Sequence, residues 1–79
     1  METIYIVSYR SYEDDESYAF RNKEKALTDV KNDMYNTINI LKSQGYKPEI
    51  AQDTDFHKEI YVPDTGIYHE WFIEESTLE

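Results

Sequence analysis

The chain has 79 residues, no cysteine, and a formal net charge of -9 from 17 acidic and 8 basic side chains. This length indicates a single domain over residues 1–79, and the missing cysteines exclude disulfides and thiolate chemistry, as suits a reducing cytoplasm. The acidic balance argues against direct binding to nucleic acid or to an anionic membrane surface, because both require clustered cations. No apolar run approaches the roughly 18 residues of a membrane span.

Two strands and an acidic connection are predicted before the helix. Residues 3–12 are rich in β-branched and aromatic side chains, and residues 17–20 form a shorter strand that pairs with them as a hairpin. The intervening residues Glu13, Asp14, Asp15 and Glu16 are predicted to form a solvated loop.

A long helix is predicted from the N-cap Asn22 to about Gln44, followed by Gly45 and Pro48 as stop signals. Its apolar residues recur every three or four positions and share one face: Leu27, Val30, Met34, Ile38 and Leu41. The spacing also permits a coiled coil, but fewer than three heptads favour packing on a sheet.

Three further strands are predicted at residues 49–52, 56–62 and 67–74. Pro63, Asp64 and Gly66 indicate a turn between the last two, in which Gly66 is the residue that tolerates a positive φ. Residues 75–79 are expected to fray. The element order predicts an α+β fold, in which one long helix packs on one face of an antiparallel sheet of four to five strands.

A turn at residues 63–66 sets the register of the last hairpin. On the face toward the helix, it pairs Val62 with Ile67, Ile60 with His69, and Lys58 with Trp71. On the other face, it pairs Tyr61 with Tyr68, Glu59 with Glu70, His57 with Phe72, and Asp55 with Glu74. Two of these pairs set like charges opposite each other, which is destabilising in a sheet.

This aromatic and acidic face has two interpretations. Its tyrosines and phenylalanine favour strands, and its carboxylates keep an open sheet face in water. Alternatively, the rings anchor a partner protein and the carboxylates bind its lysines or arginines, so that a partner's cation relieves the repulsion between Glu59 and Glu70. The candidate binding residues are Asp55, Glu59, Tyr61, Tyr68, Glu70, Phe72 and Glu74, with Glu13, Asp14, Asp15 and Glu16 as a second contact.

Charge is divided unevenly along the chain. Residues 21–47 hold six basic and three acidic side chains, whereas the remaining residues hold fourteen acidic and two basic ones. The division arises either by chance or because a surface of spaced carboxylates imitates a phosphate backbone and competes for the basic groove of a nucleic-acid-binding protein.

Signatures of catalysis and metal binding are weak. The serines lie in no nucleophile-elbow pattern, and the two glycines stand apart, so no phosphate-binding loop is predicted. His57 and His69 are predicted on opposite faces and do not share a metal. Asp53, Asp55 and His57 alternate, but without a supporting ligand pattern. We therefore expect no enzymatic activity, no cofactor and no metal.

The chain resembles the small acidic proteins encoded by bacteriophages and other mobile elements. It shares their size, lack of cysteine and richness in Tyr, Asp and Glu, and its strand Ile4-Tyr5-Ile6-Val7 precedes Asn22-Lys23-Glu24-Lys25-Ala26. The resemblance implies a cytoplasmic inhibitor, acting in the host cell if phage-encoded, that binds a basic nucleic-acid-processing protein, most concretely as an anti-CRISPR DNA mimic. The alternatives are a self-associating module that forms a homodimer and an antitoxin-like regulator of a basic partner.

Overall fold

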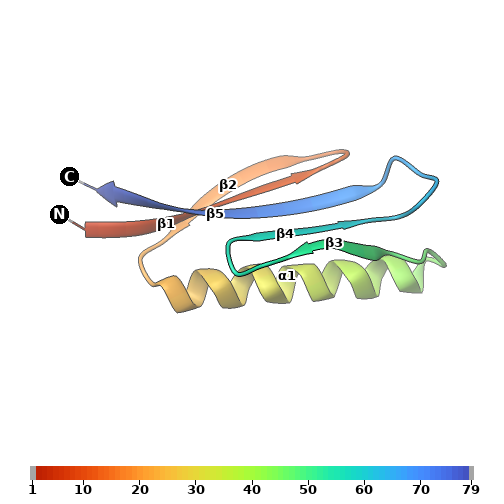
Figure 1. The fold of residues 1–79 in the computed structure, drawn as a ribbon, viewed down its shortest axis with the longest axis horizontal. Helices are drawn as coiled ribbons and strands as arrows, with labels where there is room; N and C mark the ends of the chain where they lie inside the picture. Colours follow the sequence, from red (N-terminus) through yellow and green to blue (C-terminus); the bar gives the residue numbers. More distant parts are fainter. Residues whose placement is uncertain (1, 79) are drawn as a thin grey trace.

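The computed structural model describes residues 2–78, which form one five-stranded antiparallel sheet and one helix (Figure 1). The elements in chain order are β1 (Glu2–Ser11), β2 (Asp15–Phe20), α1 (Lys23–Ser43), β3 (Glu49–Asp53), β4 (His57–Tyr61) and β5 (Tyr68–Leu78). The predicted α+β fold, with one long helix packed on one face of an antiparallel sheet, is confirmed. Within the described chain, no helix combines the length and apolar character that crossing a bilayer requires.

Both ends of α1 form where the sequence predicts them. The side chain of Asn22 accepts a hydrogen bond of 3.1 Å from the backbone N–H of Lys25, which satisfies one donor of the first turn. At the other end, Gly45 adopts a φ of 92°. The backbone N–H groups of Gly45 and Tyr46 donate to the carbonyls of Lys42 and Leu41, the paired bonds of a Schellman motif.

The strand order in the sheet is β2-β1-β5-β4-β3. The first and last strands, β1 and β5, therefore pair along its middle, from Glu2 opposite Leu78 to Ser11 opposite His69. The prediction that residues 75–79 fray is wrong for residues 75–78, because these residues belong to β5 and pair with residues 2–5. Residue 79 lies outside the described residues.

Two turns differ from expectation. The acidic loop is shorter than predicted, because β2 already begins at Asp15 and thus includes Glu16. The side chain of Ser11 accepts backbone hydrogen bonds from Glu13 and Asp14 and tightens this turn. In the turn at residues 63–66, the left-handed residue is Asp64, with a φ of 63°, and not the glycine. Asp tolerates this conformation better than most residues because its side chain bonds locally.

The helix covers one face of the sheet and buries the core between them (Figure 1). The core residues are Val7, Ala26, Val30, Met34, Ile38, Leu41, Ile60, Val62, Trp71 and Ile73. Leu27, predicted on the buried stripe, is only partly buried, while its neighbour Ala26 is fully buried. No element of residues 2–78 covers the other face of the sheet.

Lys58 is a charged residue on the covered face. It lies opposite Trp71, as the hairpin register predicts, and is 8% exposed. Its Nζ donates to the Asp53 carboxylate at 2.6 Å. A buried ammonium requires such a partner, because desolvation without one costs several kcal/mol.

Removing residues 75–79 tests the extended β5. We expect the shortened chain to lose about 1 to 3 kcal/mol of unfolding free energy, because several ladder hydrogen bonds, each contributing about 0.5–1.5 kcal/mol, are lost. Urea unfolding measures the change. The control is Glu75→Gln, which removes one charge and keeps the strand. A shortened chain as stable as the full one would mean that the pairing of these residues contributes nothing.

Candidate functional site

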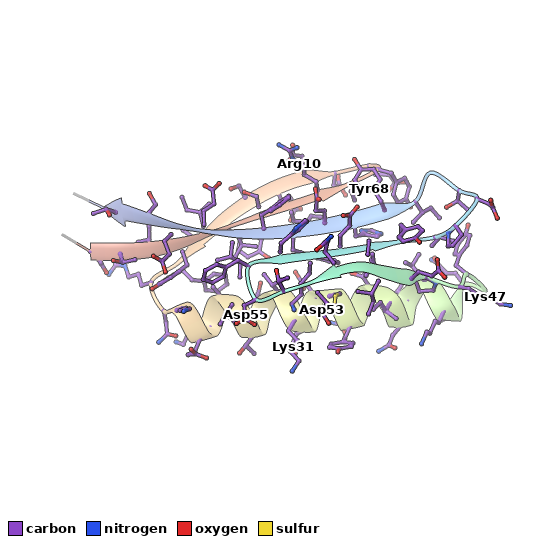
Figure 2. The ribbon with its side chains drawn as sticks, in the orientation of Figure 1. Arg10, Lys31, Lys47, Asp53, Asp55 and Tyr68 are labelled. Atoms are coloured by element: carbon purple, nitrogen blue, oxygen red, sulfur yellow. The ribbon has the colours of Figure 1, made fainter. Side chains whose placement is uncertain are left out.

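The face of the sheet turned away from α1, called here the open face, carries most of the candidate residues. By strand alternation it includes Arg10 and Asp15 from β1 and β2, His57, Glu59 and Tyr61 from β4, and Tyr68, Glu70, Phe72 and Glu74 from β5. Figure 2 shows Arg10 and Tyr68 on this side, whereas Lys31 projects from the outer side of the helix. The open face is therefore the surface on which the acidic and aromatic side chains meet.

The register of the β4–β5 hairpin brings three predicted pairs together: Tyr61 with Tyr68, Glu59 with Glu70, and His57 with Phe72. The predicted pair of Asp55 and Glu74 does not form. β4 begins only at His57, and Asp55 lies exposed in the preceding bend, where Thr54 bonds to the backbone of His57. Glu74 instead lies opposite Ile6 of β1.

A single row of polar side chains crosses the whole sheet. In spatial order it contains Gln52, Glu59, Glu70, Arg10 and Asp15, one from each strand. Arg10 thus lies between two carboxylates and is the one basic residue in the row. Local residue patterns do not predict this neighbour of Glu70, because they do not specify that β1 pairs with β5.

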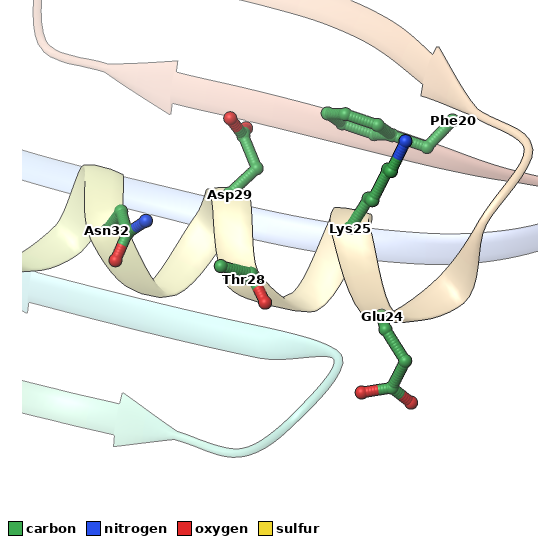
Figure 3. Close-up of a pocket in the computed structure, with 6 residues that line it drawn as sticks. All are labelled: Phe20, Glu24, Lys25, Thr28, Asp29 and Asn32. Carbon is green, nitrogen blue, oxygen red and sulfur yellow. The ribbon is translucent and has the colours of Figure 1, made fainter.

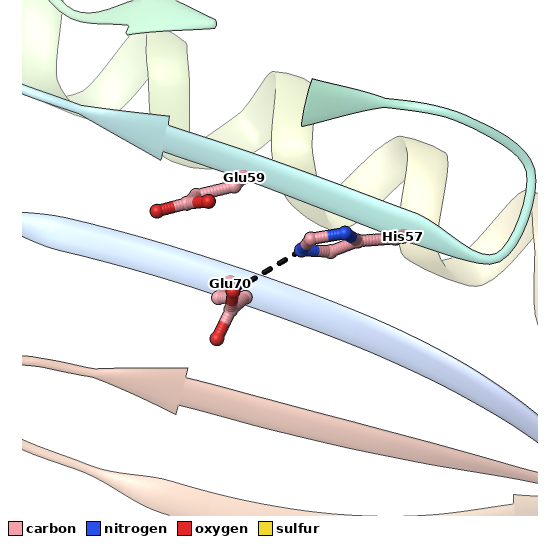
Figure 4. A group of neighbouring side chains, drawn as sticks. All are labelled: His57, Glu59 and Glu70. Carbon is pink, nitrogen blue, oxygen red and sulfur yellow. Dashed lines mark hydrogen bonds and ion pairs between the residues drawn. The ribbon is translucent and has the colours of Figure 1, made fainter. Parts of the chain in front are cut away.

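His57 makes the closest polar contact in this region. Its Nε2 lies 3.1 Å from Oε2 of Glu70, and its ring stacks on Phe72 with centroids 4.2 Å apart and planes 14° apart. One ring nitrogen of His57 and one carboxylate oxygen each of Glu59 and Glu70 all lie within 4.8 Å of one another (Figure 4). The predicted hairpin register already places His57 on the same face as Glu59, whereas the contact between His57 and Glu70 is seen only in the structure.

The three aromatic candidates differ in accessibility. Tyr61 is 38% exposed and Tyr68 is 40% exposed, so both rings are available to a partner. Phe72 is only partly exposed and supports the His57 ring. The neighbouring Glu49 carboxylate raises the pKa of Tyr61, because it favours the protonated hydroxyl.

The four residues of the predicted acidic loop point in different directions. Glu13 and Asp14 are exposed in the β1–β2 turn. Asp15 lies opposite Arg10 on the open face, whereas Glu16 lies opposite Tyr9 on the covered face. Of these four residues, only Asp15 therefore belongs to the row of polar side chains that crosses the open face.

A second acidic cluster lies at the edge between β2 and the helix. The hydroxyl of Tyr18 donates to Asp29 at 2.9 Å and lies 3.3 Å from the Asp33 carboxylate. Burial and the charge of Asp29 raise the pKa of Asp33, while burial and hydrogen bonding to Asp29 raise the pKa of Tyr18. These contacts tie the edge strand to the helix.

A shallow hollow of about 340 Å³ lies beside this cluster (Figure 3). Its lining residues are Phe20, Glu24, Lys25, Thr28, Asp29 and Asn32. The lining combines one ring with two carboxylates and one ammonium, and it is open to solvent. It lacks the enclosure that small-molecule sites usually provide.

His69 lies on the covered face, opposite to His57, as predicted. Its Nδ1 is 2.7 Å from the Tyr9 hydroxyl, and its ring stacks near Tyr9 and Trp71. Burial lowers the pKa of His69, and the charge of Glu13 opposes this shift. A neutral ring can accept the Tyr9 hydrogen bond, whereas a protonated ring cannot.

Comparisons of the chain with protein-family models, with curated proteins and with solved structures found no match. We therefore infer the function from the chemistry of the open face. That face combines carboxylates on neighbouring strands, two half-exposed tyrosines, one arginine and one histidine. Such a surface suits the binding of cationic groups.

The repulsion between Glu59 and Glu70 can be measured directly. In the presence of a metal chelator, Glu59→Gln should raise the unfolding free energy by about 0.2 to 1 kcal/mol, because like charges directly opposite each other destabilise a sheet. Urea unfolding checks the value. The matched control, Glu74→Gln, removes a carboxylate that lies on the same face opposite an isoleucine. A loss of stability in Glu59→Gln would contradict the repulsion.

The lowered pKa of His69 predicts a pH dependence. As pH falls from about 7 to about 5, the unfolded chain binds a proton near the ordinary histidine value of about 6.5, before the folded chain does. Stability should therefore fall more steeply in the wild type than in His69→Gln. Urea unfolding at several pH values across this range measures both slopes, and equal slopes would refute the prediction.

Proposed function

We propose that this protein is a non-enzymatic inhibitor that binds a basic, nucleic-acid-processing protein through its open face. An anti-CRISPR or related anti-defence protein that occupies a nucleic-acid groove is its most concrete form. One observation carries the proposal: the uncovered face of the sheet holds a row with the carboxylates of Glu59, Glu70 and Asp15, called here the acidic row. The half-exposed rings of Tyr61 and Tyr68 lie beside it.

Electrostatics supports a cationic partner. The net charge of -9 steers the protein toward basic surfaces and away from phosphate backbones. Glu59 and Glu70 belong to neighbouring strands, whose backbones are about 5 Å apart. One arginine or lysine of a partner can therefore contact both carboxylates.

The tyrosines supply the apolar part of the contact. Tyr61 and Tyr68 are directly opposite each other on β4 and β5, next to the pair of Glu59 and Glu70. Tyrosine is enriched among the residues that contribute most to protein interfaces, because its ring buries a large area with few rotatable bonds. A partner's cation also relieves the repulsion that the free protein carries.

Self-association through the same face is disfavoured by charge. The exposed tyrosines favour such a dimer, but two copies meeting face to face would bring their acidic rows together. Like-charge contacts of this kind cost several kcal/mol. An antitoxin acting on a basic toxin would use the same surface and is distinguished only by the identity of the partner.

Co-purification with mass spectrometry tests the proposal. The immobilised protein should recover a basic nucleic-acid-binding protein from a lysate of the host cell, and recovery should fall with added salt because exposed charges are screened. The variant Glu59→Lys/Glu70→Lys should recover at least about tenfold less, since it opposes a cationic partner. It replaces the pair of carboxylates by a pair of ammonium groups, and it also sets a cation opposite Arg10, so its folding is verified before its recovery is compared.

The matched control is Glu24→Lys/Glu75→Lys. It makes the same change in net charge at exposed positions outside the open face. Circular dichroism verifies that both variants fold. Recovery of no basic nucleic-acid-binding protein, or equal losses in both variants, would overturn the proposal. Light scattering of the isolated protein reports any dimer.

A further inference from the structure

We propose that His57, Glu59 and Glu70 form a Zn²⁺-binding site on the open face. The inference goes beyond the proposed function and does not depend on it. It also departs from the sequence-based expectation of no metal. Imidazole nitrogen and carboxylate oxygen are established zinc ligands, and three protein ligands with a solvent-filled fourth position form a common zinc arrangement.

The sheet brings the three ligands together. His57 and Glu59 are two residues apart on β4, so their side chains project from the same face. Glu70 lies opposite Glu59 on β5. The hairpin register that the turn at residues 63–66 sets therefore decides the composition of the site.

The separations of the donor atoms fit a zinc ion after a small adjustment. Zinc bonds of about 2.0–2.2 Å in a tetrahedral site place neighbouring ligand atoms about 3.3–3.6 Å apart. Nε2 of His57 and Oε2 of Glu70 are already 3.1 Å apart. The widest separation among the three donors is no more than 4.8 Å, which a rotation of the Glu59 side chain can close.

Three features suit these side chains to a metal site. The His57 ring is stacked on Phe72, which limits its rotation. The side chains of His57 and Glu70 are 30% and 21% exposed, so both are partly enclosed yet open to an entering ion. Both ligand-bearing strands are paired on each side within the sheet, and a site on paired strands is held more rigidly than one on loops.

Charge favours a divalent cation at this position. Glu59 and Glu70 are like charges directly opposite each other, and among residues 2–78 no lysine or arginine forms a salt bridge with either of them. A divalent ion offsets both carboxylates. The nitrogen ligand favours Zn²⁺ over Mg²⁺ or Ca²⁺, which prefer oxygen ligands.

Titration of the isolated, metal-free protein with zinc chloride tests the site. Calorimetry should show saturable binding of one ion per chain. Nuclear magnetic resonance should show shifted ring signals for His57 and unshifted ones for His69, the only other histidine, which lies on the opposite face. An equal concentration of Mg²⁺ should not displace the zinc.

Matched variants assign the ligands. Glu59→Gln and His57→Gln should each weaken zinc binding by at least about tenfold, because loss even of a residue that only supports a ligand weakens metal sites by about 10–100-fold. Glu74→Gln, on the same face, should bind as the wild type does. Since Glu59→Gln is expected to be more stable than the wild type without metal, weaker binding by that variant cannot be attributed to unfolding.

Three outcomes would overturn the site: no saturable zinc binding, unchanged binding in Glu59→Gln or His57→Gln, and ready displacement by Mg²⁺. The last would identify a general acidic surface without the imidazole ligand. Because no partner protein is present, these outcomes are independent of those of the co-purification.

Discussion

The antiparallel pairing of β1 with β5 is the constraint on which the rest of the structure depends. It joins the two ends of the described chain over ten residue pairs in the middle of the sheet. β2 and β4 then follow on either side through short hairpins, and β3 extends the far edge. The same pairing places Val7 beside Ile73 and Tyr9 beside Trp71, forming the surface on which the helix packs.

This pairing also determines the character of the open face. The helix can cover only one side of a five-stranded sheet, so the polar and aromatic side chains of the other side remain accessible. Arg10 comes to lie beside Glu70 only because β1 and β5 are neighbours. It offsets part of the acidic charge in the row, while Glu59 is left without such a neighbour.

The two proposals concern the same physical feature, a pair of carboxylates that gains from a bound cation. A partner's arginine or lysine and a zinc ion would each offset the charges of Glu59 and Glu70. They would therefore compete for this position. A zinc ion at this position would reduce the negative charge offered to a basic partner.

Local residue patterns are enough to predict the helix with its caps at Asn22 and Gly45, and the register of the hairpin closed by residues 63–66. These depend on contacts between residues close in the chain, where capping, periodicity and turn chemistry act directly. Tertiary structure alone decided the strand order, the pairing of residues 75–78 and the position of Arg10 beside Glu70. All three features depend on the pairing between the two ends of the chain. Local residue patterns specify which face of a strand is apolar, but they do not specify which distant strand lies next to it.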